Sequence, residues 1–338
     1  MRILALVESI EHVCCRYRLK AFADPLAQAG YALEFSSFPE QPWGWFRLQR
    51  RLRDFQGVIV QRKLLHRWQC RQLQGKNRFL IFDFDDAVYA RDSYSPKGIR
   101  SRRRQRRFET MIRLADAVVA GNEFLALHAL QSSPYDHVFV IPTCVDPRRY
   151  SLAQHRSADN VHLVWIGSSS TLQGLERIKP MLDDLGRCFP NLRLKLICDR
   201  FFSLPNLQTV PHRWNDAEET TLLADSDIGI SWIPDDEWSR GKCGLKILQY
   251  MAAGLPVVTN PVGVHGQLVQ DGVHGYLANS FRDWKEALGR LASDPALRRR
   301  LGWNGRKRVE RQYSVAVGSH SWLMLLEWLA RKKLRRSA

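Results

Sequence analysis

The sequence predicts an α/β protein made of two doubly wound parallel-sheet domains, and three observations support this prediction. Short apolar runs alternate along the chain with longer segments of helical periodicity, which is typical of a parallel sheet covered on both faces. A polar stretch at 151–160 interrupts this alternation, and the same alternation then begins again. With 338 residues, the chain is long enough for two domains of ordinary size.

The first series of elements occupies residues 1–150, where we expect an N-terminal domain. Short runs of β-branched and aromatic residues predict six strands: Ile3–Val7, Tyr31–Phe38, Gly57–Val60, Phe79–Phe82, Ala117–Ala120 and Val138–Ile141. Apolar residues that recur every three or four positions predict the helices between them: Arg18–Ala29, Phe46–Phe55, Trp68–Leu73, Ile99–Leu114 and Glu123–Leu130.

The second series begins after the polar stretch, and we expect a second domain over 160–315. The same criteria predict strands at Val161–Ile166, Leu192–Cys198, near Val210, Ile228–Trp232 and Val257–Val258. They predict helices at Leu175–Leu185, Ala217–Leu223, Cys243–Gly254, Trp284–Leu291, Ala296–Gly302 and Ser319–Leu334. An apolar stripe in the last helix (Trp322, Leu325, Leu326 and Leu329) predicts that 316–338 returns to pack on the first domain.

The charge of the chain favours anionic partners. The net charge is +17, and residues 1–150 hold 25 Lys and Arg against 15 Asp and Glu. Phosphorylated small molecules, an anionic membrane surface and nucleic acid would all suit this field. One basic run (Arg100, Arg102, Arg103, Arg104, Arg106 and Arg107) would suit membrane phospholipid or a pyrophosphate-linked acceptor, with nucleic acid as another partner and a merely solvated helix face as the alternative. No nucleic-acid motif accompanies the run, so nucleic acid is the less favoured partner.

Cysteine usage and hydropathy favour a cytoplasmic protein. The seven cysteines show no C-x-x-C spacing, so neither a zinc site nor a disulfide framework is indicated. The apolar run before Glu8 is too short for a signal peptide, and no segment reaches the length of a membrane span. Peripheral association with the cytoplasmic membrane face is a further option.

The segment Arg240–Gly275 contains a predicted phosphate site. Lys242, Lys246 and Gln249 are spaced i, i+4, i+7, so on one continuous helix they would share a face. Ammonium groups beside a helix N-terminus attract anions, because its unpaired N–H groups and dipole already favour negative charge. The alternative is a solvated lysine face on an ordinary amphipathic helix.

A second phosphate-binding candidate is the loop that begins at Gly167. Glycine and the hydroxyl residues that follow it (Ser168, Ser169, Ser170 and Thr171) lie between a predicted strand and a predicted helix. Glycine lets a phosphate approach the backbone, and hydroxyl and N–H groups can hold its oxygens. The loop is neither a P-loop nor a dinucleotide fingerprint, and an ordinary serine-rich loop is the alternative.

Three carboxylates follow the strand Phe79–Phe82, namely Asp83, Asp85 and Asp86. They could bind sugar hydroxyls, act as a general base or hold Mg²⁺. The pattern also resembles the first motif of haloacid-dehalogenase-type phosphatases, in which Asp83 would be the nucleophile and Asp85 the acid/base, although Ala87 departs from it. Pairing with arginines such as Arg91 is the structural alternative.

The segment from Arg240 to Gly275 and the tail resemble the group 1 glycosyltransferases, which are retaining enzymes of the GT-B fold. The matching residues are Gly244, Leu245, Met251, Ala252, Gly254, Pro256, Val257, Val258, Gly263, Asp271, Gly272 and Gly275, followed by a tail from Leu297–Arg298 to Tyr313–Ser314. The resemblance covers roughly 160–315. It implies two facing Rossmann-like domains with a C-terminal crossover helix.

Three departures accompany this resemblance. The two glutamates of the family's E-x7-E motif fall on Gly241 and Gln249, and the basic pair expected after the first strand of the second domain is replaced by Ser168–Gln173. A glutamine can still bind ribose hydroxyls, whereas glycine cannot contact the donor sugar. Lys246 and Lys242 would then supply the positive charge for the leaving diphosphate.

The resemblance implies transfer of a sugar from a UDP- or GDP-sugar to a saccharide or lipid-linked acceptor, with retention, in surface polysaccharide or glycan biosynthesis. No cofactor or metal is expected. The candidate catalytic residues are Lys246, Asp85 and Asp86. The donor site would comprise Gly167, Ser168, Ser169, Asp199, Arg240, Lys242, Gly244, Leu245 and Gln249, and the acceptor would contact His12, Arg16 and Arg18. An Mg-dependent phosphatase and a non-catalytic nucleotide-binding protein of this fold are the rival interpretations.

Overall fold

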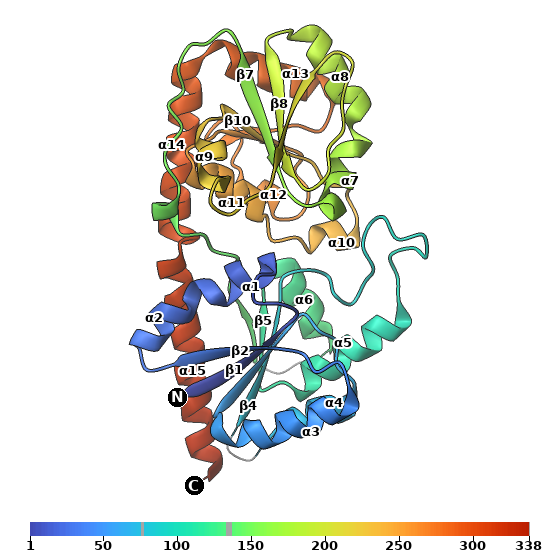
Figure 1. Ribbon diagram of the computed structural model, residues 1–338, viewed down its shortest axis with the longest axis vertical. Helices are drawn as coiled ribbons and strands as arrows, with labels where there is room; N and C mark the ends of the chain where they lie inside the picture. Colours follow the sequence, from blue (N-terminus) through green and yellow to red (C-terminus); the bar gives the residue numbers. More distant parts are fainter. Residues whose placement is uncertain (76–77, 133–136, 338) are drawn as a thin grey trace. The chain divides into compact units, whose positions relative to one another are not determined.

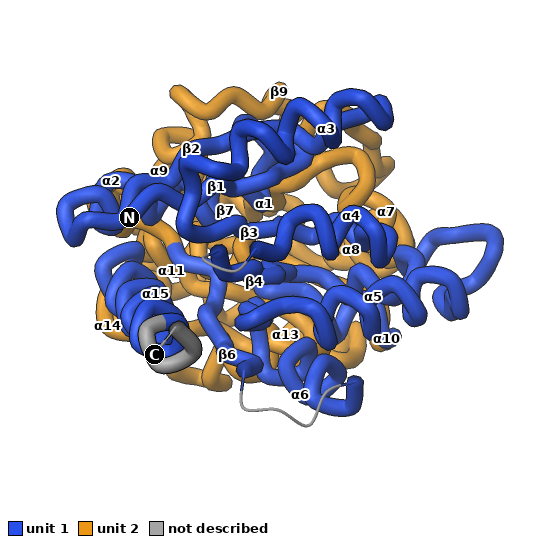
Figure 2. The backbone as a smooth tube through the Cα atoms, turned by 90° about the horizontal axis from the view of Figure 1, so that it is seen from below, with its two compact units in different colours: residues 1–144, 236–243, 315–338 blue, residues 145–235, 244–314 orange. Residues whose placement is uncertain are grey.

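A computed structural model of the chain describes residues 1–75, 78–132 and 137–337 (Figure 1). Unit 1 comprises Met1–Cys144, Asp236–Cys243 and Val315–Ala338, and unit 2 comprises Val145–Asp235 and Gly244–Ser314 (Figure 2). Each unit contains one six-stranded sheet in which all neighbouring strands are parallel. The predicted class, two doubly wound α/β domains, is therefore confirmed.

The sheet of unit 1 reverses its strand order next to the first strand. The strands are β1 (Arg2–Val7), β2 (Ala32–Ser37), β3 (Gly57–Gln61), β4 (Phe79–Phe84), β5 (Ala117–Ala120) and β6 (Val138–Val140), in the order β2-β1-β3-β4-β5-β6. The chain passes from β1 to β2 on one side and then to β3 on the other. Ligands of such sheets bind beyond the carboxyl ends of the strands at this reversal.

Helices cover both faces of this sheet. One face is covered by α3 (Pro42–Arg51), α4 (Arg67–Leu73), α5 (Arg102–Leu114) and α6 (Glu123–Ser132). The other is covered by α1 (Val13–Arg18), α2 (Ala23–Gln28) and α15 (Val315–Ser337). The apolar stripe of α15 is buried there beside Ile3 and Ala5, with Trp322 and Leu326 at most 1% exposed. Short 3₁₀ turns occupy Lys20–Phe22 and Leu52–Asp54.

The sheet of unit 2 reverses in the same way beside its own first strand. Its strands are β7 (Val161–Ile166), β8 (Leu192–Cys198), β9 (Gln208–Arg213), β10 (Ile228–Ser231), β11 (Val257–Thr259) and β12 (Gly275–Leu277), in the order β12-β11-β10-β7-β8-β9. Its helices are α7 (Ser169–Arg177), α8 (Lys179–Cys188), α9 (Glu219–Ala224), α11 (Leu245–Ala252), α12 (His265–Leu268), α13 (Phe281–Ser293) and α14 (Pro295–Gln312), and a 3₁₀ turn lies at Pro147–Arg149. The reversal lies between β7 and β10.

Two predicted helices are broken in the structure, each beside a proline. The segment predicted as Arg18–Ala29 contains the end of α1, a 3₁₀ turn and α2, and Pro25 lies in the first turn of α2. The segment predicted as Leu175–Leu185 spans α7 and α8, with Pro180 in the first turn of α8. Proline fits the first turn of a helix but not its interior, so a new helix begins just before each one.

The region around Lys242 also differs from its prediction. A short helix, α10 (Glu237–Arg240), precedes it, and α11 begins at Leu245 rather than near Cys243, because Gly244 takes a left-handed conformation with φ of 68°. Lys242 lies outside α11 and belongs to unit 1, whereas Lys246 and Gln249 belong to unit 2. The prediction that these three side chains share one helix face is therefore wrong.

Two further observations concern membrane-spanning helices and the state of the cysteines. Within the described ranges, no helix has the length and apolarity needed to cross a membrane. All seven cysteines are free thiols, and Cys188 is the one among them that is exposed.

Candidate functional site

The carboxyl ends of β7 and β10 in unit 2 are joined by a buried tyrosine of α11. The Tyr250 hydroxyl accepts a hydrogen bond from the Ile166 N–H at 3.0 Å and donates one to the Ile230 carbonyl at 3.2 Å. Its ring lies over Gly229, where a Cβ would approach the ring to 2.4 Å. Glycine at 229 thus lets α11 pack closely against the sheet, which places the first turn of α11 at the reversal of strand order.

Lys246 lies in that first turn and reaches the loop after β7. Its Nζ lies 3.3 Å from the Thr171 hydroxyl and 5.1 Å from the centre of the Trp165 ring. A Cβ on Gly167 would lie 2.9 Å from Lys246 Cε and 2.6 Å from both Thr171 Oγ1 and the Trp165 ring. Glycine at 167 therefore lets Thr171, Trp165 and Lys246 all pack against the loop backbone.

Hydrogen bonds join the polar groups of this loop to one another and to Asp199, which follows β8. Ser168 N–H donates to Thr171 Oγ1 at 3.2 Å, and Ser169 N–H donates to a carboxylate oxygen of Asp199 at 2.6 Å. The hydrogen bond from Ser169 lowers the pKa of Asp199 below its ordinary value. The structure thus brings Gly167, Ser168, Ser169, Asp199 and Lys246 together, and the Asp199 carboxylate caps the start of α7.

Gln249 lies one helical turn further on and is buried. Its amide donates to Glu219 at 2.8 Å, and the other Glu219 oxygen accepts from the Trp214 indole N–H at 2.8 Å. The Tyr150 hydroxyl adds a third donor to Glu219 at 3.3 Å. Sequence reasoning missed Glu219, which is 2% exposed, because a single glutamate at the start of a helix carries no recognisable pattern.

Near Lys246, a neutral histidine follows β11. His265 is 3% exposed, and its Nδ1 lies 2.8 Å from the Thr259 hydroxyl. Burial, and secondly the ammonium of Lys246, lower the pKa of His265 to about 3. His265 is therefore uncharged at neutral pH and adds no positive charge to the site.

In unit 1, Asp83 and Arg18 form a buried ion pair. Arg18 is 1% exposed and Asp83 is fully buried. The guanidinium of Arg18 donates to both Asp83 oxygens and to the carbonyl of Ile141, and Gln61 adds a 3.3 Å hydrogen bond to Asp83. The pairing occupies the carboxylate that the rival phosphatase would use as its nucleophile and the guanidinium expected to contact an acceptor, and both side chains are at most 1% exposed.

Asp85 and Asp86 are joined by Arg62 rather than by Arg91. Arg62 lies 3.0 Å from Asp85 and 2.6 Å from Asp86, and Lys242 Nζ lies 3.0 Å from the other oxygen of Asp86. Burial by itself would raise the pKa of Asp86, but Lys242 and Arg62 outweigh it and hold this pKa below its ordinary value. Arg91 donates instead to the carbonyls of Lys97 and Gly98.

Arg62 adopts a positive φ of 59° at the end of β3, which is unusual for a residue other than glycine. Such a conformation costs about 1–3 kcal/mol and persists where the surroundings enforce it. The ion pairs with Asp85 and Asp86 hold the guanidinium of Arg62 in this conformation.

Lys242 belongs to the segment Asp236–Cys243, which packs closely against the rest of unit 1. The Asn122 side chain donates to the carbonyls of Gly241 and Lys242 at 3.1 and 3.0 Å. A Cβ on Gly241 would lie 2.9 Å from the Cβ and N of Ala87, and one on Gly121 would lie 2.4 Å from Cys243 Sγ. Gly241, the position to which the sequence resemblance assigned the first glutamate, thus packs its backbone against Ala87.

The remaining predicted residues have structural partners of their own. His12 is half-buried, and its ring accepts a hydrogen bond from Cys14 N–H at 3.3 Å at the start of α1. The Arg16 guanidinium lies 5.6 Å from the centre of the Tyr17 ring. Arg240 is exposed in α10 of unit 1, while Gly244 and Leu245 begin α11 of unit 2. The predicted donor set is therefore divided between the two units.

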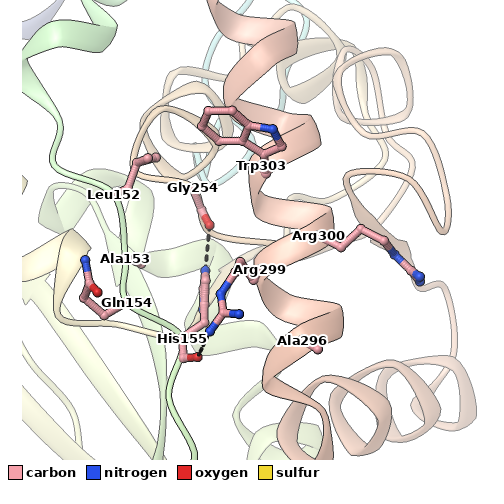
Figure 3. Close-up of a pocket in the computed structure, with 9 residues that line it drawn as sticks. All are labelled: Leu152, Ala153, Gln154, His155, Gly254, Ala296, Arg299, Arg300 and Trp303. Atoms are coloured by element: carbon pink, nitrogen blue, oxygen red, sulfur yellow. Dashed lines mark hydrogen bonds between the residues drawn. The ribbon is translucent and has the colours of Figure 1, made fainter.

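A cavity of about 620 Å³ lies elsewhere in unit 2 (Figure 3). It adjoins Gly254, His155 and Trp303, beyond the end of α11 opposite Lys246. His155 hydrogen-bonds the carbonyl of Gly254 at 2.8 Å, while Arg300 points away from the other labelled side chains in Figure 3. This cavity does not coincide with the polar groups around Lys246. Among the described residues, no group of three or more His, Cys, Asp or Glu is placed to hold a metal ion.

Comparison with known proteins gives a consistent picture of the fold. A family model described as glycosyl transferase-like matches residues 177–322, which is less than half of the chain. A search of curated protein sequences found no match. Sucrose-phosphate synthase from Thermosynechococcus elongatus superimposes with a TM-score of 0.74 at 16% identity, covering 98% of this chain and 99% of that one.

Two further solved structures match over nearly the whole chain. HepE from Anabaena in complex with UDP and glucose has a TM-score of 0.70 at 17% identity, covering 97% of this chain and 99% of that chain. WaaG, a glycosyltransferase involved in lipopolysaccharide biosynthesis, has a TM-score of 0.66 at 15% identity, covering 95% and 98%. The chain therefore has the GT-B fold, with two Rossmann-like units.

Proposed function

We propose that this protein is a glycosyltransferase that takes a sugar from a nucleotide-sugar donor, UDP- or GDP-linked, and transfers it to a saccharide or lipid-linked acceptor. The observation that carries the proposal is the position of Lys246 over the Gly167 loop, at the carboxyl ends of β7 and β10. Similarity to a glycosyl transferase-like model and to a structure that binds UDP and glucose supports it.

The first step of the reaction is departure of the nucleoside diphosphate, which develops negative charge. Lys246 is fixed by its contacts with Trp165 and Thr171, so its positive charge is in place before the bond breaks. Preorganised charge of this kind stabilises a transition state by about 3 kcal/mol for each donor. Lys246 thus does from α11 what the basic pair after the first strand does in the family that the sequence resembles.

The second part of the proposal concerns stereochemistry and metal. We expect front-face attack with retention. We also expect no metal requirement, because the Lys246 ammonium would supply positive charge at the proposed diphosphate position. Gln249 would contact the donor ribose, with its amide oriented by Glu219.

Asp85 and Asp86 are the acceptor-side candidates, and His12 and Arg16 remain candidates for acceptor contact. A role in surface polysaccharide synthesis inside a reducing cytoplasm fits the seven free thiols.

The test is incubation of the full chain with a panel of UDP- and GDP-sugars, with and without saccharide acceptors, followed by assay of released nucleoside diphosphate. We expect release from one donor, undiminished by EDTA, and a product with the donor's anomeric configuration by NMR. Failure of every sugar nucleotide to turn over would contradict the transfer activity, and an inverted product would contradict retention alone.

A non-catalytic nucleotide-binding protein is the second candidate, and Gly241 is the observation that favours it. At this position the chain has no side chain with which to contact a donor sugar, and its backbone packs against Ala87. This candidate predicts that UDP or GDP binds while no sugar nucleotide is turned over, so the same panel distinguishes the two.

A further inference from the structure

The outer surface of α3, α4 and α5 in unit 1 combines exposed aromatic rings with arginines. These helices lie side by side over one face of the sheet, where α3, α4 and α5 are labelled in Figure 2. Trp43 is 61% exposed, Phe46 is 64% exposed and Trp68 is 49% exposed. The Trp68 ring packs edge-on against the buried Trp45 at 5.7 Å, so α3 and α4 form a continuous surface.

The orientation of α3 places its rings and charges on the same outward side. Trp45 and Leu48 are buried against the sheet. On the opposite side lie Trp43, Phe46, Arg47 and Arg50, whose spacing of i, i+3, i+4 and i+7 makes one helix face. Phe46 and Trp43 therefore project into solvent beside two guanidinium groups rather than into the core.

The charge of this surface is almost entirely positive. The segments 42–51, 67–73 and 102–114 contain eleven arginines and a single acidic residue, Glu109. Several of these arginines are exposed and have no carboxylate within 4.0 Å among the residues that the structure describes: Arg47, Arg50, Arg67, Arg103 and Arg106. Their charge is therefore available to an external partner.

We propose that this aromatic–arginine face (Trp43, Phe46, Arg47, Arg50, Arg67, Trp68, Arg71, Arg103 and Arg106) binds the surface of an anionic phospholipid bilayer. The arginines contact lipid phosphates, and the Trp and Phe rings enter the interface between head groups and acyl chains. Binding is peripheral and leaves the helices folded as they are. The proposal goes beyond the transfer reaction and does not depend on it.

The chemistry favours a bilayer over a single-stranded nucleic acid. Both are polyanions, and the arginines alone would serve either. The two most exposed rings lie on one rigid helix at i and i+3, so they project in the same direction, as insertion into an apolar layer requires. A bilayer accepts apolar rings anywhere along its surface, whereas a nucleic acid accepts them only where a base can stack.

The experiment is co-sedimentation of the full chain with sucrose-loaded vesicles in physiological salt. Vesicles of phosphatidylcholine alone are compared with vesicles in which about one lipid in three is phosphatidylglycerol. We expect binding to the anionic vesicles and at least tenfold weaker binding to the neutral ones. Each arginine near an anionic surface contributes a factor of about five in affinity.

Two variants address the two chemical components of the face. Trp43→Ser/Phe46→Ser removes the rings, and Arg103→Gln/Arg106→Gln removes two charges. Both sets of side chains are exposed, so the fold is retained, which circular dichroism checks. We expect each double variant to bind anionic vesicles at least tenfold more weakly. The matched control is Trp303→Ser/Arg300→Gln, an exposed ring and arginine of α14 in unit 2, which is expected to bind like the wild type.

Three outcomes would overturn the proposal. The first is absence of binding to anionic vesicles, and the second is equal weakening in the control variant. The third is binding to single-stranded RNA that the ring variant weakens while vesicle binding is unchanged. None of these results depends on sugar transfer, so failure here leaves the proposed function untouched.

Discussion

At the scale of single residues, the two lysines of the predicted phosphate site have different surroundings. Lys246 packs on Trp165 and Thr171 beside the Gly167 loop, whereas Lys242 pairs with Asp86 in unit 1. Lys242 also lies 4.7 Å from the centre of the Trp238 ring. We therefore propose Lys246 as the residue that faces a donor diphosphate, and Lys242 belongs to the ion-pair cluster around Arg62.

Replacement of Lys246 by alanine should reduce turnover of the preferred sugar nucleotide by about 10²–10³-fold, because it removes one preorganised charge from the transition state. Lys246→Arg should retain part of the activity. The measurement is steady-state release of nucleoside diphosphate. Lys179→Ala is the matched control, since this lysine also lies over an aromatic ring of unit 2, at 4.3 Å from Phe202. Equal loss in both variants would refute a specific role for Lys246.

Replacement of Asp86 by asparagine should destabilise unit 1 in a pH-dependent way. Removing one member of a fully buried pair costs about 3–5 kcal/mol, and because these side chains are 11–28% exposed we expect about 2 kcal/mol at pH 7. The folded pKa of Asp86 is lowered, so its stabilisation is complete above the unfolded pKa near 4 and is lost as pH falls through the folded pKa.

The test compares urea unfolding of the wild type and Asp86→Asn at pH 7 and near pH 3. The difference in free energy of unfolding should shrink at the lower pH. A difference that stays constant between the two pH values would show that Asp86 does not act through its charge.

At the scale of elements, the segment Asp236–Cys243 accounts for the glycine at position 241. Ser93 hydroxyl contacts Asp236 and Ser239 at 3.0 and 3.1 Å, and Asn122 binds the carbonyls of Gly241 and Lys242. Within this arrangement the backbone at 241 lies too close to Ala87 for any side chain. The glycine is a packing requirement of unit 1, and the position cannot carry a donor-binding carboxylate without moving the segment.

Gly241→Ala should therefore lower the free energy of unfolding by about 1–3 kcal/mol, because its Cβ would lie 2.9 Å from Ala87 and force a shift. Gly266→Ala is the matched control. Its Cβ would meet its nearest neighbour, Pro261, at 3.6 Å, so a change within about 0.5 kcal/mol is expected. Thermal denaturation of both variants measures the difference, and equal stability would contradict the packing argument.

At the scale of the whole molecule, the chain crosses between units more than once. It leaves unit 2 after Asp235, returns to it at Gly244, and ends in unit 1 with α15. Trp322, Leu325, Leu326 and Leu329 of this helix are at most 2% exposed and belong to the same apolar cluster as β1. The last helix is thus part of the core of the first unit.

Trp322→Ala should destabilise unit 1 by about 3–5 kcal/mol, the usual cost of removing a buried aromatic side chain. Hydrogen exchange should quicken in β1 and β3 while β7 and β8 keep their protection. Met324→Ala on the same helix is the control, because Met324 is 60% exposed and its loss should change little. Uniform loss of protection in both units would contradict the assignment of α15 to unit 1.

The fold class could be predicted from the sequence because buried parallel strands are short, strongly apolar runs. Of the strands in the described part of the chain, all except β12 lie on or near predicted ones. The site was predicted less well. Gly167 and Lys246 were predicted because glycine and lysine beside strand and helix ends have a recognisable chemistry, and the structure places them in contact, while their role stays a prediction. Glu219, Arg62 and Tyr250 were missed, since their importance comes from tertiary contacts between segments distant in sequence.

The most direct test of the central claim is calorimetric titration of UDP and GDP into the full chain and into Lys246→Ala. We predict saturable binding of one of these nucleotides to the wild type, with affinity at least tenfold weaker in Lys246→Ala and unchanged in Lys179→Ala. If neither nucleotide binds at millimolar concentration, or if Lys246→Ala binds as tightly as the wild type, the assignment of a donor diphosphate to Lys246 is wrong.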